Sequence, residues 1–110
     1  MKQYVIDELR PSDHETLKAY LDGHLESTGV SGLYHLRLPE DLLTDIQKAH
    51  DRCQPLYLAL ELGPDALACE LLVRTDSCVR CDCMGYATPE QCKWAMETVD
   101  AVLDKLSLIH

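Results

Sequence analysis

Apolar and polar residues alternate between residues 55 and 87 in a pattern that predicts three antiparallel strands. Within each strand the apolar positions fall on one face, and that face is built mainly from leucine. The predicted core positions are Leu56, Leu58, Leu60 and Leu62 in the first strand, Leu67, Cys69, Leu71 and Val73 in the second, and Val79, Cys81 and Cys83 in the third.

Two short turns would join these strands into a meander. A two-residue Pro-Asp turn would pair Leu62 with Leu67, which keeps the apolar positions of both strands on the same side. A turn of three residues at 75–77 would likewise place Leu71 opposite Cys81. The pattern therefore predicts the faces of the strands, and it predicts their register to within a slip of two residues.

Two helices are predicted in the first half of the chain, at residues 13–25 and 39–52. Ser12 and Glu15 have the spacing of a capping box, in which each side chain satisfies a backbone donor of the first turn. The second helix would begin at a proline and turn one apolar stripe inward. The residues of that stripe are Leu42, Leu43, Ile46, Ala49, His50 and Cys53.

A third helix is predicted after Thr88, which forms a second capping box with Gln91. Further short strands are predicted at residues 3–9 and 33–38. The element order is then β-α-β-α-β-β-β-α, an α+β fold in which an antiparallel three-stranded meander carries helices on its leucine-rich face. We expect residues 1–110 to form a single domain.

Composition limits the partners that such a domain would bind. The chain of 110 residues carries 19 acidic and 10 basic residues, a net charge of −9, which repels nucleic acid and anionic membranes. Residues 1–10 contain no apolar run of the length that a signal peptide requires. We therefore expect a cytoplasmic protein whose six cysteines are thiols, with no nucleic acid or membrane partner and no cofactor.

The cysteines nevertheless suggest a possible metal or redox function. Cys78 and Cys81 have the C-x-x-C spacing of a zinc-binding turn, but on a strand the two side chains would point to opposite faces. The residues better placed to share a metal are Cys81, Cys83, Cys53 and His50. Because small buried cysteines pack well without any ligand, core packing is the favoured interpretation of these residues.

A third hypothesis is a small enzyme that uses Asp13 and His14 as acid and base at the first strand-helix junction. Helix capping and solvation explain the same two residues. The sequence contains no nucleophile motif and no phosphate-binding glycine loop. A non-enzymatic function is therefore favoured.

The second face of the meander indicates the leading hypothesis. It mixes aromatic, aliphatic and charged positions, although an open sheet face is normally polar. Trp94 lies off the apolar stripe of the last helix and would either cover a neighbouring element or contact a partner. We expect a non-enzymatic domain that binds a protein partner or forms a homodimer. The predicted partner-binding residues are Tyr57, Leu72, Met84, Tyr86 and Trp94.

Overall fold

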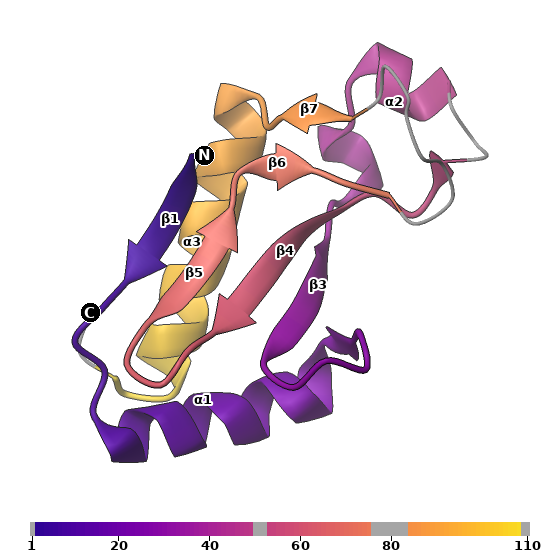
Figure 1. The fold of residues 1–110 in the computed structure, drawn as a ribbon. Coiled ribbons are helices and arrows are strands. Elements are labelled where there is room, and N and C mark those ends of the chain that lie inside the picture. The colour runs from indigo at the N-terminus through magenta and orange to yellow at the C-terminus, as the bar shows by residue number, and fades with distance from the viewer. Residues whose placement is uncertain (1, 50–52, 76–83, 109–110) are drawn as a thin grey trace.

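The computed structural model describes residues 2–49, 53–75 and 84–108 of the chain. Its main sheet has five antiparallel strands in the order β1-β5-β4-β3-β2. The strands are β1 (Gln3–Ile6), β2 (Glu26–Ser27), β3 (Leu33–Arg37), β4 (Tyr57–Leu62) and β5 (Leu67–Glu70), and a second, two-stranded sheet pairs β6 (Leu72–Val73) with β7 (Gly85–Tyr86). The helices are α1 (Pro11–His24), α2 (Asp45–Ala49) and α3 (Pro89–Lys105), with a 3-10 turn η1 (Glu40–Leu42) before α2. The α+β class and the predicted order of elements are confirmed (Figure 1).

The register of the β4–β5 hairpin is the predicted one, with Leu62 opposite Leu67. Further along, Tyr57 bridges to Arg74, so residues 58–59 of β4 lie opposite residues 70–73 of the neighbouring strand. The two extra residues form a bulge that separates β5 from β6. Because the excess is even, the alternation of faces continues through it.

Strands β1 and β7 lie one after the other along the same edge of β5 and β6. The backbone N–H of Leu71 donates to the carbonyl of Lys2 at 3.0 Å, and its carbonyl accepts from the N–H of Ala87 at 2.9 Å. Strands β1 and β7 therefore meet at a single residue, Leu71.

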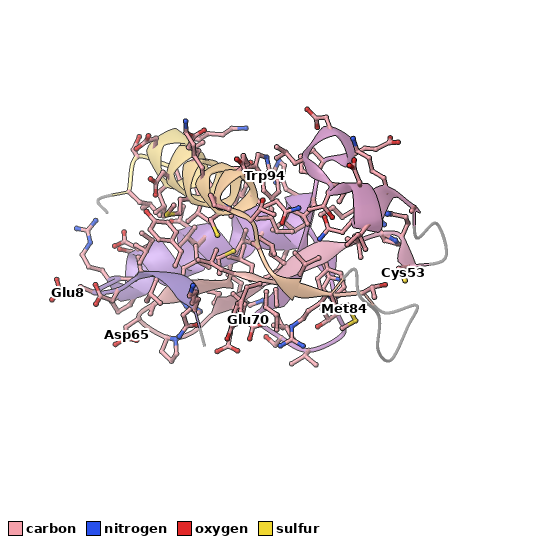
Figure 2. All side chains as sticks on the ribbon, turned by 90° about the horizontal axis from the view of Figure 1, so that it is seen from above. Glu8, Cys53, Asp65, Glu70, Met84 and Trp94 are labelled. Carbon is pink, nitrogen blue, oxygen red and sulfur yellow. The ribbon has the colours of Figure 1, made fainter. Side chains whose placement is uncertain are left out.

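Helices α1 and α3 cover one face of the main sheet, as seen from above in Figure 2. The apolar side chains of that face form the core with the inward stripes of both helices. Because phenylalanine is absent, leucine supplies most of the volume. The most deeply buried core residues are Leu17, Leu21, Tyr34, Leu56, Leu58, Leu67, Cys69, Val73, Ala95 and Leu103. The leucine-rich core face is thus confirmed.

The predicted start of α3 is confirmed, but that of α1 is wrong. In α3, Gln91 N–H donates to Thr88 Oγ1 at 3.2 Å, and Thr88 N–H donates to Gln91 Oε1 at 3.0 Å. Helix α1 begins at Pro11, and the backbone N–H of Arg10 donates to the carboxylate of Asp13 at 3.1 Å. Proline suits the first helical position because its missing N–H would have no partner there. The cap therefore lies two residues before the predicted Ser12.

The predicted second helix is present, but its bounds and its predicted inward face are wrong. A 3-10 turn ends near Leu43, and α2 starts anew after Thr44, which forms a capping box with Gln47 through bonds of 3.0 and 3.2 Å. The new start changes which side of the helix faces the core. Gln47 is buried, whereas Ile46, predicted to be internal, is 54% exposed. His50 lies outside the described residues.

The predicted register of the third meander strand is wrong as well. Leu72 pairs with Tyr86 and Val73 pairs with Gly85, so the connection spans residues 74–84 and is far longer than the predicted three-residue turn. Alternation fixes which face a side chain occupies, but a shift of two residues or a multiple of two leaves that pattern unchanged. The predicted strand positions Val79, Cys81 and Cys83 lie outside the described residues.

Candidate functional site

The face of the main sheet that points away from α1 and α3 is uncovered by any helix of the described residues, and we call it the open face. It holds a hollow of about 340 Å³. Figure 2 shows Glu70 on this side of the sheet and Trp94 on the other. The residues that line the hollow are Gln3, Leu33, His35, Tyr57, Ala59, Glu61, Ala68, Glu70 and Arg74.

The hollow exists because small and large side chains occur side by side on the central strands. Ala59 on β4 and Ala68 on β5 line it with single methyl groups. Next to Ala59 the His35 ring stacks on the Tyr57 ring, with centroids 3.6 Å apart and planes at 12°. The His35 ring covers the Tyr57 ring, and Tyr57 is only 8% exposed. Sequence alternation had assigned Tyr57 to this face, and it lies there.

The described side chains around the hollow carry charges of both signs. Arg74 Nε donates to Glu70 Oε1 at 2.9 Å, which forms an ion pair beside the hollow. Arg37 and Glu61 stand on the same face by strand alternation. Around the hollow, two arginines therefore stand beside two glutamates among the described side chains, whereas the whole chain carries −9.

Of the other predicted partner-binding residues, Leu72 and Tyr86 form a cross-strand pair next to the hollow. Tyr86 is 57% exposed, and the ammonium of Lys2 lies 5.6 Å from its ring centroid. Met84 is half-buried and packs against the core. Leu72 and Tyr86 can thus extend the open face beyond the hollow.

Trp94 belongs to a different surface. It is half-buried on α3, packs against the core and lies on the helix side of the sheet (Figure 2). A partner that contacts the open face would not reach Trp94 at the same time. The five predicted residues therefore do not form one continuous surface.

Among the residues that the structure describes, no group of three or more His, Cys, Asp or Glu side chains could hold a metal ion. Cys53 is buried, and its carbonyl accepts a hydrogen bond from Thr75 Oγ1. Cys81, Cys83 and His50 lie outside the described residues. The proposed four-residue metal site stays a prediction.

Asp13 and His14 each have a structural partner. The Arg10 guanidinium donates to Asp13 at 3.1 Å, and hydrogen bonds from the Arg10 side chain and backbone hold the pKa of Asp13 below its usual value. His14 Nδ1 lies 2.8 Å from the carbonyl oxygen of Gly63, in the β4–β5 turn. These contacts cap α1 and fasten it to the sheet, so capping and support explain both residues.

A second recess lies on the helix side, between α1 and α3, and sequence reasoning missed it. It has a volume of about 280 Å³ and is lined by Tyr20, Leu21, His24, Leu25, Leu36, Leu60, Leu67, Thr98, Val99 and Val102. Strand alternation correctly marked two of these residues, Leu60 and Leu67, as inward. It carried no information on how the two helices diverge, and that divergence opens the recess.

Comparison of the chain with protein-family models, with curated proteins and with solved structures found no match. No helix within the described part of the chain is long and apolar enough to cross a membrane. The hollow of the open face and the recess between α1 and α3 are therefore the features that bear on function.

Proposed function

We propose that this chain is a non-enzymatic, cytoplasmic domain that self-associates through its open face. The observation that carries the proposal is an uncovered sheet face that is hollowed, partly apolar and lined by charges of both signs. A solvent-facing side of an antiparallel sheet is normally polar throughout. A mixed face of this kind is typical of a surface that another protein covers.

The mixed charge of this face favours a second copy of the same chain as the occupant. Two copies that each carry −9 repel each other least when they meet through a surface that presents charges of both signs, because salt screens the more distant charges. A two-fold interface also requires that one surface complement itself. The open face offers Arg37 and Arg74 together with Glu61 and Glu70, so each copy can present cations to the anions of the other.

The test is the oligomeric state of variants measured by light scattering coupled to size exclusion. Leu72→Glu and Tyr86→Glu each place a new carboxylate at the rim of the hollow, where association would bury it without a partner. Tyr86→Glu is the cleaner variant, because Tyr86 is exposed in the single chain and its replacement should leave folding intact. The matched control is Ile46→Glu, another exposed apolar residue, which lies on α2 away from the open face.

We expect the unmodified chain to be a dimer at micromolar concentration. Both open-face variants should shift toward monomer with a native-like circular dichroism spectrum, while Ile46→Glu stays dimeric. A monomeric wild-type chain would defeat self-association. Dimers that persist in both variants would exclude the open face as the dimer contact.

A further inference from the structure

The recess between α1 and α3 reaches through the helix layer to the sheet. Its floor crosses three neighbouring strands, with Leu36 from β3, Leu60 from β4 and Leu67 from β5. These leucines belong to the buried core. The recess is therefore a narrow opening toward the apolar interior.

Two polar side chains of the recess, Thr98 and His24, already have hydrogen-bond partners. Thr98 Oγ1 donates to the carbonyl of Trp94 at 2.7 Å, and His24 Nδ1 lies 2.8 Å from the carbonyl oxygen of Tyr20. The His24 ring also stacks on Tyr20, with centroids 4.0 Å apart. The remaining lining is aliphatic. A ligand of this recess must therefore bind chiefly through apolar contacts.

A lysine without a described ion-pair partner lies at the mouth of the recess. A shallower groove along α3 shares Tyr20, Thr98 and Val102 with the recess and adds Lys105. The Lys105 ammonium lies 5.4 Å from the Tyr20 ring centroid and forms no ion pair with a described carboxylate. Glu97, also in the groove, lies 3.9 Å from Lys93. Lys105 is thus available to an anion at the mouth.

The size of the recess limits the ligand. A cavity of about 150 Å³ lined by Leu, Ile and Phe stays dry and binds benzene. The recess of about 280 Å³ has room for an aliphatic chain on the order of ten carbons. Such a chain would cover the floor leucines and leave its head group near Lys105.

We propose that the α1–α3 recess binds a medium-length aliphatic chain that bears an anionic head group, with the chain on Leu36, Leu60 and Leu67 and the head group beside Lys105. The proposal is independent of the open face, which lies on the other side of the sheet. Long-range repulsion between the acidic protein and the anionic head group is weak at physiological salt, since it is screened within about 8 Å.

The experiment titrates the full chain with decanoate and, separately, with decanol. Trp94 is the single tryptophan, and it lies in the groove at the mouth, so its fluorescence reports occupancy. Isothermal calorimetry gives the stoichiometry. The blocking variant is Val102→Phe, which fills the recess, and its matched control is Met96→Phe, on the exposed side of α3. The head-group variant is Lys105→Gln, with Lys93→Gln as its control on the same helix.

We expect one decanoate per chain, at least tenfold weaker binding in Val102→Phe, and unchanged binding in Met96→Phe. Lys105→Gln should weaken decanoate several-fold and leave decanol unaffected, whereas Lys93→Gln should change neither. Absence of saturable binding up to the solubility limit of decanoate would overturn the proposal, as would equal affinity in Val102→Phe. Should Val102→Phe fail to fold, Thr98→Leu supplies the same test with a smaller side chain.

Discussion

The side-chain amide of Gln91 donates a hydrogen bond to Oε1 of Gln47 at 2.9 Å, and both side chains are buried. Each glutamine also closes a capping box, with Thr88 at the start of α3 and with Thr44 at the start of α2. The same Gln91 amide donates to the carbonyl of Leu42 at 2.9 Å. Two helix starts far apart in the sequence are therefore locked together by one polar network.

Replacement of Gln91 by Glu should destabilise the domain by about 1–3 kcal/mol, because it removes the donor to Gln47 and Leu42 while keeping the cap acceptor. An ordinary capping box forms equally with Gln or Glu at its third helical position. Urea unfolding followed by circular dichroism measures the change. Glu90→Gln, next to it on the exposed side, is the control and should change stability by less than about 0.5 kcal/mol. Equal effects of the two substitutions would contradict the network.

Gly32→Ala should destabilise the domain by about 1–3 kcal/mol. Gly32 has a φ of +81°, and an added Cβ would lie 2.7 Å from the carbonyl oxygen of Leu62. The matched substitution is Gly23→Ala near the end of α1, where nothing lies within 4 Å. Alanine should stabilise the helix there by about 0.5–1 kcal/mol. Thermal unfolding of both variants should therefore give shifts of opposite sign.

Stability should fall in alkaline solution, in part through Tyr34. Burial and the hydrogen bond to Asp22 raise the pKa of Tyr34 from 10.0 to about 12. The unfolded chain loses this proton first, so the contribution is complete below pH 10 and is lost as the pH rises toward 12. In urea unfolding at several pH values, Tyr34→Phe should show a weaker decline over this interval. A parallel decline in both proteins would assign the alkaline loss to other groups.

Cys69 should resist alkylation in the native state. It is 1% exposed, and burial is the main cause that raises its pKa to about 12, followed by the negative charge of Glu70. Little nucleophilic thiolate is then present at neutral pH. Cys53 is buried too and should behave similarly. Mass spectrometry after iodoacetamide treatment should show both cysteines unmodified, whereas denatured, reduced protein should react at all six thiols. Rapid native modification of Cys69 would contradict the described burial.

The sequence predicted the parts of the fold that depend on local alternation. Leu62 opposite Leu67 follows from a tight turn between two strands whose apolar faces must match. The pairing of Leu72 with Tyr86 could not be obtained in this way, because the long connection removes the constraint that a short turn gives. The break before α2 was missed because the Thr44–Gln47 box lies inside a continuous apolar stripe.

In the candidate sites, too, the sequence predicted what local alternation determines and missed what depends on packing between elements. Alternation assigned Tyr57 to the open face correctly, since a strand side chain has only two directions available. The hollow beside it depends on the stacking of His35 on Tyr57, a contact between two strands that no single-strand pattern contains. The recess next to Tyr20 depends on the angle between α1 and α3, which is a property of the packed domain.

Because Gln3 pairs with Glu70, strand β1 can pair with β5 only after residues 67–70 have been synthesised. Strand β1 leaves the ribosome long before β5, so Ile6 stays without its neighbour Leu67 while the central hairpin is still being made. The leucines of β4 and β5 that pack in the same core as α1 are likewise synthesised after the helix. During synthesis, β1 and α1 therefore cannot complete their packing until the β4–β5 hairpin has emerged.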